Sequence, residues 1–361
     1  MNPFTMRYPQ DDLDDLARRL ERVRWPDEVA DEDGARGVPG DRMRKLVEYW
    51  RDGFDWRAAE ARFNAFPQFT TEIDGATVYF LHVRSPRPDA LPLIITHGWP
   101  SSPADFLDVI EPLRADFHLV IPAIPGFGPS APTRDGGWDV HRVARAWATL
   151  MERLGYDRYG AQGGDWGSPV SRLLAAEAPD RVVGVHTNYL GVPAPSDLDA
   201  LTPDDRERAD QINRYLAEPA GYWRMQEHRP QTLAYALADS PGGQLAWITD
   251  RIEAWADPDI GVPDDHILTT ATLYWLSGTA GSSSRLHHES GSGRRRGPIP
   301  CPTPLGVAVF ANDLIRPIRE VAERAYDVVH WSEFDRGGHF PSLETPDLLT
   351  KDIRTFFNSL P

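Results

Sequence analysis

This 361-residue chain has little cysteine, fewer basic than acidic residues and no long apolar run, and each of these features excludes some classes of protein. Cys301 is its sole cysteine, so an internal disulfide is excluded and a cysteine-based metal cluster is not expected. Acidic residues outnumber basic ones by 54 to 38, which gives a net charge of −16. We therefore expect neither nucleic acid, which requires a basic face, nor an anionic membrane among its partners.

The targeting signals of secreted and membrane proteins are also missing. No run approaches about 18 consecutive apolar residues, so no membrane-spanning helix is expected. Residues 1–12 have neither the basic region nor the apolar core of a signal peptide. Since the chain is long enough to bury a large core unaided, we expect a soluble cytoplasmic protein that carries no cofactor and no metal.

Apolar runs with strand character alternate with helical patterns over much of the chain. Two of them, at 70–73 and 77–83, flank Asp74-Gly75, which is a strong hairpin signal. Further strands are predicted at 91–96, 117–121, 159–162, 182–186, 305–310 and 327–334, and helices at 103–113, 139–154, 168–178 and 344–357. This alternation favours an α/β fold built on a mostly parallel sheet of eight strands.

Two regions interrupt the alternation. The first ninety residues form an appended segment with amphipathic helices predicted at 11–24 and 41–53. After 196 the patterns are helical and rich in Trp and Tyr, and 281–297 (GSSSRLHHESGSGRRRG) has the composition of a flexible loop. We therefore divide the chain into an N-terminal extension (1–90), a first part of the α/β core (91–195), a helical cap (196–297) and a second part of the core (298–361).

Residues 163–168, Gly-Gly-Asp-Trp-Gly-Ser, lie between a predicted strand and a predicted helix. Small residues around one reactive side chain in that position are typical of a nucleophile elbow, and the reactive side chain here is Asp165. A carboxylate suits attack on a saturated carbon, which gives an ester that water then cleaves. Alternatively, Asp165 only caps the following helix, although Ser168 could fill that role.

His97-Gly98-Trp99-Pro100 directly follows the predicted strand at 91–96. In elbow-type hydrolases a backbone N–H of this loop joins the N–H after the nucleophile to form an oxyanion hole. The backbone amides of Trp99 and Trp166 are the candidates. His97 could itself act as a base, but we expect it to fix the loop, because a better candidate lies downstream.

That candidate base is His339, which follows the last predicted strand and two glycines that leave room for a projecting loop. The chain order nucleophile, acid, histidine fits an α/β-hydrolase. We expect the acid after the preceding strand, where Asp313 stands, since the other known position offers only Asn188. Glu333 and Asp335 lie too near His339 in sequence to orient it easily.

Motifs spread over nearly the whole chain resemble those of microsomal-type epoxide hydrolases, α/β-hydrolases with an N-terminal extension. The extension carries YWR (49–51), FDW (54–56) and FPQF (66–69), and the core carries HGWP (97–100), IPGFG (124–128), GGDWG (163–167) and GGHF (337–340). The resemblance implies an enzyme that hydrolyses an epoxide to a vicinal diol. In it Asp165 is the nucleophile, Asp313 the acid partner and His339 the base that activates water.

The family also uses two cap tyrosines that donate hydrogen bonds to the epoxide oxygen as it becomes an alkoxide. By the resemblance Tyr222 is the first of these. At the second position, just after Arg285, the sequence reads LHH, so the tyrosine is missing and His287 stands in its apparent place. His287 could be a replacement donor, but the Gly, Ser and Arg around it favour a polar residue in a mobile loop.

Two other functions remain open. A haloalkane dehalogenase-like enzyme also uses an Asp elbow, and tryptophan N–H groups can hold its halide; a non-catalytic homologue would only bind a small molecule. The many cap aromatics suggest an apolar or aromatic epoxide, which with water would be the only partners of the reaction. A role in detoxification or secondary metabolism, and a homodimer formed through the N-terminal segment, are further hypotheses.

Overall fold

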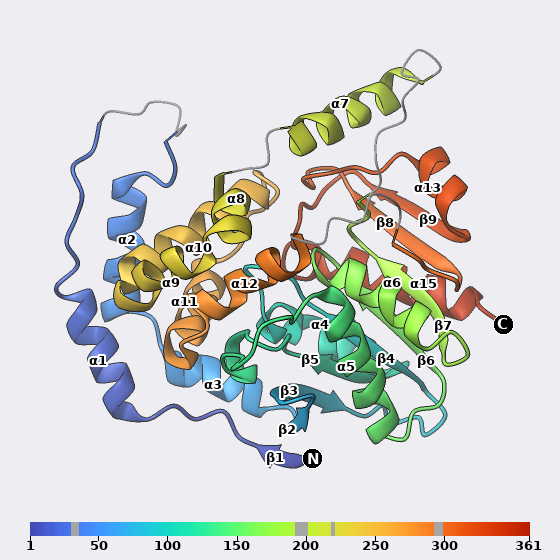
Figure 1. The fold of residues 1–361 in the computed structure, drawn as a ribbon, viewed down its shortest axis with the longest axis horizontal. Helices are drawn as coiled ribbons and strands as arrows, with labels where there is room; N and C mark the ends of the chain where they lie inside the picture. The colour runs from blue at the N-terminus through green and yellow to red at the C-terminus, as the bar shows by residue number, and fades with distance from the viewer. Residues whose placement is uncertain (30–35, 192–200, 218–220, 292–298) are drawn as a thin grey trace.

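The computed structural model describes residues 1–29, 36–191, 201–217, 221–291 and 299–361 (Figure 1). One sheet with the order β1-β2-β3-β5-β4-β6-β7-β8-β9 forms its centre. The strands are β1 (Asn2–Phe4), β2 (Gln68–Ile73), β3 (Ala76–Val83), β4 (Leu91–Thr96), β5 (Phe117–Pro122), β6 (Tyr159–Gly163), β7 (Val182–Thr187), β8 (Leu305–Phe310) and β9 (Val328–Phe334). The six strands β5, β4, β6, β7, β8 and β9 are parallel to one another. At one edge β3, β2 and β1 are added, each antiparallel to its neighbour.

This sheet confirms the predicted α/β architecture and all eight predicted strands. The ninth strand, β1, was not predicted because three residues are too short to show an alternating pattern. Asp74 and Gly75 have positive φ angles of 49° and 77° and form the predicted hairpin turn between β2 and β3.

Helices cover both faces of the sheet because side chains alternate along each strand. In β3, Val78 and Phe80 belong to one buried cluster, and Tyr79 and Leu81 belong to the other. The first cluster includes α5 (Val140–Arg153) and α6 (Gly167–Glu177), and the second includes α4 (Leu107–Arg114) and α15 (Pro346–Ser359). The carboxyl ends of the parallel strands therefore emerge between two helical layers.

A second His–Asp group, which the sequence did not reveal, lies between the sheet and α15. Asp352 of α15 accepts hydrogen bonds from His186 Nε2 of β7 at 2.9 Å and from His330 Nε2 of β9 at 2.8 Å. Ser332 Oγ donates to the same carboxylate at 2.5 Å. We call these four residues the sheet cluster.

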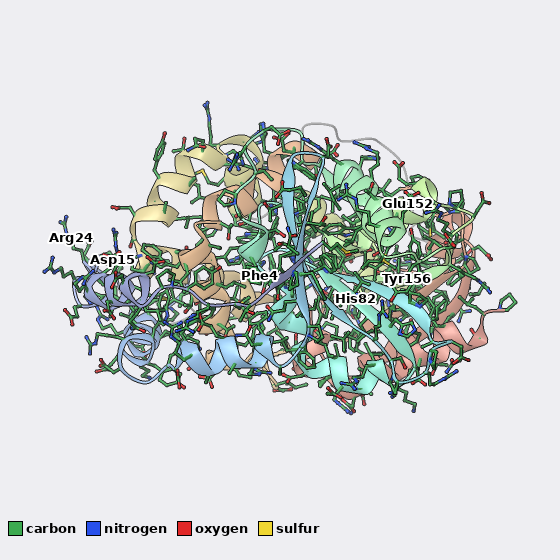
Figure 2. The ribbon with its side chains drawn as sticks, turned by 90° about the horizontal axis from the view of Figure 1, so that it is seen from below. Phe4, Asp15, Arg24, His82, Glu152 and Tyr156 are labelled. Atoms are coloured by element: carbon green, nitrogen blue, oxygen red, sulfur yellow. The ribbon has the colours of Figure 1, made fainter. Side chains whose placement is uncertain are left out.

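The N-terminal extension folds along one side of the molecule as α1 (Gln10–Leu20), α2 (Gly40–Asp52) and α3 (Trp56–Asn64). Helix α3 was not predicted, although Asp55 caps it by accepting from the N–H groups of Arg57 and Ala58. Figure 2 shows the chain running from Phe4, beside the sheet, to the far end where Asp15 and Arg24 lie.

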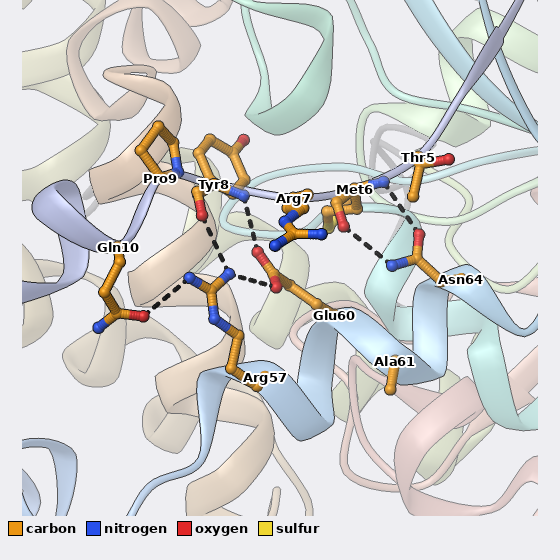
Figure 3. A pocket seen from close by; sticks show the side chains of 10 residues that line it. All are labelled: Thr5, Met6, Arg7, Tyr8, Pro9, Gln10, Arg57, Glu60, Ala61 and Asn64. Carbon is orange, nitrogen blue, oxygen red and sulfur yellow. Dashed lines mark hydrogen bonds and ion pairs between the residues drawn. The ribbon is translucent and has the colours of Figure 1, made fainter.

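Residues 5–10, here called the strap, join β1 to α1 and lie across α3 (Figure 3). Met6 N–H donates to Asn64 Oδ1 and Asn64 Nδ2 donates back to Met6 O, both at 2.9 Å. Tyr8 N–H donates to the buried carboxylate of Glu60 at 2.8 Å, and Arg57 donates to Tyr8 O at 3.0 Å. Four hydrogen bonds between the backbone of the strap and side chains of α3 therefore hold the strap in place.

The helical cap is inserted between β7 and β8, which are neighbours in the sheet, as expected. Its helices are α7 (Pro203–Ala217), α8 (Gly221–His228), α9 (Pro230–Asp239), α10 (Pro241–Trp255), α11 (Asp264–Ser277) and α12 (Ala280–Gly291). Figure 1 shows α8 to α12 between the N-terminal helices and the sheet.

The prediction of a flexible loop over 281–297 is wrong for 281–291, which belong to helix α12; residues 292–297 lie outside the described residues. The serines that suggested a loop are buried and hydrogen-bonded. Ser283 Oγ and Ser284 Oγ donate to Ala280 O, and Ser282 Oγ donates to Gly126 O in the core. Tertiary contacts therefore override the weak helix propensity of this run.

Candidate active site

The three residues proposed as nucleophile, acid and base lie together at one edge of the sheet. Asp165 follows β6, Asp313 follows β8 and His339 follows β9. Because these strands are parallel, their carboxyl ends open on the same side, and the loops after them meet there. The sequence order of the strands therefore brings together residues that lie up to 174 positions apart.

Asp165 stands on a sharp turn between β6 and α6, with a positive φ of 46°. An ideal Cβ at Gly167 would lie 2.0 Å from Thr96 O, and one at Gly98 would lie 2.1 Å from Asp165 Oδ1. The neighbouring glycines thus make room both for the turn and for the carboxylate. The turn has the geometry of an elbow. The N-cap residue of α6 is Trp166, and the Asp165 carboxylate faces Trp99 N–H and His339.

The side chains form a continuous hydrogen-bonded set. His339 Nδ1 lies 2.7 Å from Asp313 Oδ1, and His339 Nε2 lies 3.3 Å from Asp165 Oδ2. The imidazole and the Asp313 carboxylate are almost completely buried, whereas the Asp165 side chain remains 22% exposed. The base is therefore held by one carboxylate and directed at the other, which is the one that a ligand can reach.

The other oxygen of Asp165 is held by the backbone. Trp99 N–H donates to Asp165 Oδ1 at 2.8 Å, and the neighbouring backbone N–H of Trp166 also lowers the pKa of this carboxyl group. These are the two amides that the sequence predicted for the oxyanion hole. One carboxylate oxygen thus occupies the hole, while Oδ2 is left facing His339.

The charges of this set are strongly coupled. Burial raises the pKa of Asp165, but hydrogen bonds from His339, Trp99 and Trp166 outweigh it and hold the pKa below its usual range. Burial lowers the pKa of His339, but its ion pairs with Asp313 and Asp165 more than offset this and raise it to about 10. At neutral pH the resting site therefore holds an imidazolium between two carboxylates.

The remaining candidates from the sequence have other partners. His97 Nε2 accepts from Ile124 N–H at 3.1 Å, and burial lowers the pKa of His97 to about 4, so it is a neutral residue that fixes the loop, as expected. Glu333 accepts two hydrogen bonds from Arg208. The carboxylate that contacts His339 Nδ1 is therefore that of Asp313, and Glu333 is paired with Arg208.

Two buried carboxylates that the sequence analysis missed hold the loop of His339. Glu344 accepts from the N–H groups of Asp257, Gly338 and Phe340. Asp257, in the cap, accepts from Gly337 N–H at 2.7 Å. No motif marks these two residues. The one signal in the sequence is that Glu344 itself is a carboxylate four residues after the GGHF motif.

Aromatic residues of the cap and of the HGWP loop form a wall above Asp165. The rings of Tyr222 and Trp99 are stacked, with centroids 5.4 Å apart and planes 7° apart. Trp255 lies edge-on to Tyr222 at 5.2 Å and to His339 at 5.2 Å. Tyr222 is 7% exposed, so its phenol is directed into a nearly dry environment.

His287 lies in this wall, contrary to the expectation of a polar residue in a mobile loop. It is 1% exposed, and its ring centroid lies 5.9 Å from that of Tyr222 and 5.0 Å from that of Trp166. Burial lowers its pKa to about 3, so it is a neutral imidazole.

Only donors face the ring nitrogens of His287 in the described part of the chain. Trp166 Nε1 lies 3.4 Å from His287 Nε2, and Gln226 Nε2 lies 3.0 Å from His287 Nδ1. The orientation of the Gln226 amide is fixed because its oxygen accepts from Trp247 Nε1 at 3.0 Å and from Ser284 Oγ at 3.2 Å. The sequence analysis missed Gln226, although it stands one helical turn after Tyr222.

A small cavity of about 30 Å³ adjoins both Asp165 and His339, and Asn188 also lines it. Its size matches a single water molecule. Among the described residues, no group of three or more His, Cys, Asp or Glu could hold a metal ion. Within the same ranges, no helix combines the length and apolar character that crossing a bilayer requires.

This fold is that of an α/β-hydrolase, and the elbow after β6 carries the carboxylate of Asp165. The model of the α/β hydrolase fold matches residues 92–243, and the model of the epoxide hydrolase N terminus matches residues 1–106. The chain is similar to a Stigmatella aurantiaca protein carrying an epoxide hydrolase name (42% identity, 100% of this chain, 85% of the relative) and to pig epoxide hydrolase 1 (30%, 100% and 89%). The Aspergillus niger epoxide hydrolase structure matches with a TM-score of 0.93 at 31% identity, over 100% of this chain and 96% of that one.

The chain therefore belongs to the epoxide hydrolase family, whose members are hydrolases that act on ether bonds.

Proposed function

We propose that this enzyme opens an epoxide through a covalent ester on Asp165 and then hydrolyses the ester with water activated by His339. The observation that supports this most directly is the division of labour at the Asp165 carboxylate. Oδ1 is bound by the Trp99 amide at 2.8 Å, and Oδ2, which has only the longer 3.3 Å contact with His339 Nε2, is the oxygen that attacks a carbon atom.

In the first step, Asp165 Oδ2 forms a bond to an epoxide carbon and the carbon–oxygen bond of the ring breaks. The electron pair of that bond moves to the epoxide oxygen, which takes a proton from the Tyr222 hydroxyl. The resulting phenolate recovers a proton from the protonated His339 in the native enzyme and from solvent in its absence, so ester formation itself does not require His339. Asp165 Oδ1 stays in the hole as the carbonyl oxygen of the new ester.

In the second step, His339 takes a proton from water and the hydroxide adds to the ester carbon. The charge develops on Oδ1, where the amides of Trp99 and Trp166 meet it. His339 becomes available as a base because the ester carries no charge, so one of the two carboxylates that raise its pKa is lost. Collapse of the intermediate releases the diol and restores Asp165.

We propose that Tyr222 is the principal donor to the epoxide oxygen and that His287 is a second donor. A neutral imidazole has one N–H, and in the described residues the ring nitrogens of His287 face only the donors Trp166 and Gln226. Neither donor can accept the imidazole N–H, and we propose that the epoxide oxygen accepts it when a bound substrate turns the ring away from Gln226. The same contact argues against a dehalogenase, because the Trp166 indole N–H is directed at His287 and not at a halide.

Single turnover in ¹⁸O-labelled water tests the covalent route. The first diol should carry no label, because its new oxygen comes from Asp165, and the label should appear in the carboxylate. In His339→Gln, incubation with styrene oxide should accumulate an adduct visible by intact mass, and Asp165→Asn should form none. A fully labelled first diol would mean that water attacks directly, and the covalent route would be wrong.

The finer aspects of function rest on the sequence and on the aromatic wall. We propose an apolar or aromatic epoxide as the substrate, and a cytoplasmic enzyme of detoxification or secondary metabolism. We retain the four-part division of the chain, with the cap over 196–297, and the homodimer as hypotheses. A screen of aryl and alkyl epoxides with chiral analysis of the diols tests the substrate class.

A further inference from the structure

An arginine side chain packs against the aromatic wall. The guanidinium carbon of Arg251, on α10, lies 5.2 Å from the ring centroid of Tyr222 and 5.8 Å from that of Trp255. A guanidinium over an aromatic face within about 6 Å is attracted by the negative potential of the ring. Arg251 therefore interacts directly with the ring of the proposed proton donor.

The position of this guanidinium is fixed. Arg251 Nε donates to Asp250 Oδ2 at 2.9 Å, and Nη2 contacts the same oxygen. Trp255 follows Arg251 by one helical turn, so the backbone of α10 sets their contact. The side chain is only 18% exposed, so water screens its charge weakly.

The reaction creates a need for positive charge at this place. Before attack the negative charge lies on Asp165, and ring opening moves it to the epoxide oxygen and the phenol that protonates it. Burial, Tyr215 and Asp165 all raise the pKa of Tyr222, and Arg251 acts in the opposite direction. When Asp165 loses its charge by forming the ester, it no longer raises the pKa of Tyr222. Arg251 still stabilises negative charge on the phenol.

We propose that Arg251 is a positioning residue for ring opening, whose guanidinium holds the Tyr222 ring in place and stabilises the negative charge that its phenol shares with the epoxide oxygen. The inference rests on the proposed function, in which Tyr222 is the donor. It predicts an effect on formation of the ester and none on its hydrolysis, since hydrolysis places its charge on Asp165 Oδ1.

The test measures the rate of adduct formation with styrene oxide in the His339→Gln background, where the ester accumulates. Arg251→Met, which keeps the bulk and removes the charge, should slow formation about tenfold, the size expected for a desolvated cation–π contact. Arg251→Lys should stay within about threefold of the parent, because a lysine ammonium is also attracted to the ring face. Arg19→Met is the matched control, since Arg19 lies over Trp275 at 5.5 Å, outside the site, and should change nothing.

A double mutant separates charge from packing. In Tyr222→Phe, which lacks the hydroxyl but keeps the ring, Arg251→Met should change adduct formation by less than about twofold. In enzyme with the native His339, decay of the adduct should be unaffected by Arg251→Met. An equal slowing in the presence and absence of the hydroxyl, or of both reaction steps, would show that Arg251 only packs, and the inference would be overturned.

The failure of this inference can be told apart from failure of the proposed function. If Tyr222→Phe slows adduct formation and Arg251→Met does not, only the role of Arg251 is refuted. If Tyr222→Phe has no effect, the donor is misassigned and the role of Arg251 is refuted with it. If no adduct forms in the His339→Gln parent, the covalent route itself is wrong.

Discussion

Two buried sets of histidine and aspartate lie on the same sheet, and they differ in what holds them. In the active site one histidine, His339, lies between two carboxylates, and all three side chains stand on loops after strands. In the sheet cluster one carboxylate, Asp352, lies between two histidines that belong to the strands themselves. The residue types are alike, but the first set lines a cavity and accepts from the backbone N–H of Trp99, whereas the hydrogen bonds described for Asp352 come from side chains.

The comparison teaches that placement decides what such residues can do. A strand fixes a side chain against its neighbours, so the members of the sheet cluster are held in mutual hydrogen bonds around a carboxylate that is 5% exposed. Loops at the carboxyl ends of parallel strands leave one carboxylate oxygen accessible and direct amides at the other. We expect the first set to govern turnover and the second to govern stability.

The largest effect is expected from Asp313→Asn. Asparagine keeps the shape but removes the charge that holds the imidazole and stabilises its protonated form. Hydrolysis of the ester should fall by about 10³–10⁴-fold, as in other triads that lose their acid, while ester formation continues. Rapid-quench mass spectrometry of the adduct measures both steps, and normal decay would show that another acid serves His339.

Asp352→Asn should show the opposite pattern. It leaves one histidine N–H facing an amide NH₂ group, which costs about 1–3 kcal/mol of unfolding free energy for a buried unpaired donor. We expect a lower urea midpoint and a kcat within about threefold of the parent. If turnover in Asp352→Asn falls as far as in Asp313→Asn, the assignment of the sheet cluster to stability alone is wrong.

The two sets should lose their stabilising effect at opposite ends of the pH scale. Relative to an ordinary value of 6.5, the pKa of His339 is raised to about 10, so its contribution is complete below 6.5 and is lost as the pH rises towards 10. Relative to 3.8, burial raises the pKa of Asp352, but hydrogen bonds from His186 and its neighbours lower it to about 2, so its contribution is present above 3.8 and is lost as the pH falls through 2.

Urea unfolding of the parent, His339→Gln and Asp352→Asn from pH 2 to pH 10 checks this difference. The gap between parent and His339→Gln should shrink on the alkaline side, and the gap between parent and Asp352→Asn on the acid side. Gaps that stay constant with pH would refute the assigned shifts.

The smallest effect is expected from Glu344→Gln, which disturbs the loop but none of the reacting groups. An amide in place of the carboxylate leaves one of three backbone N–H groups without an acceptor. Hydrolysis of the ester should slow about three- to tenfold, equivalent to about 1 kcal/mol of lost hydrogen bonding. An effect confined to ester formation would mean that Glu344 acts somewhere other than at the His339 loop.

The parts of the site that follow a local rule could be predicted from the sequence. An elbow needs small residues around Asp165, and the chain order then indicates where Asp313 and His339 must stand. The strands could be predicted as well, because their apolar runs are bounded by turn residues. These features depend on residues that are close in the sequence or on a topology that has few alternatives.

The parts that depend on side chains from distant segments could not be predicted. His287 was expected in a loop because Gly and Ser weaken a helix. Instead Ser282 bonds to Gly126 O and His287 contacts Gln226, so this run is a buried helix. In the sequence Arg251 looks like an ordinary charged residue on the surface of a helix. The fold places its guanidinium over the ring of Tyr222. The sheet cluster likewise joins residues of β7, β9 and α15, and no spacing in the sequence marks it.

The N-terminal extension has a mechanical consequence. The strap joins the edge of the sheet to α1, and α1 and α2 pack against α10 of the cap, while α3 packs against α11. The N-terminal extension therefore braces the cap against the sheet along that side, because one continuous segment is paired with the sheet at β1 and packs against cap helices at α1, α2 and α3.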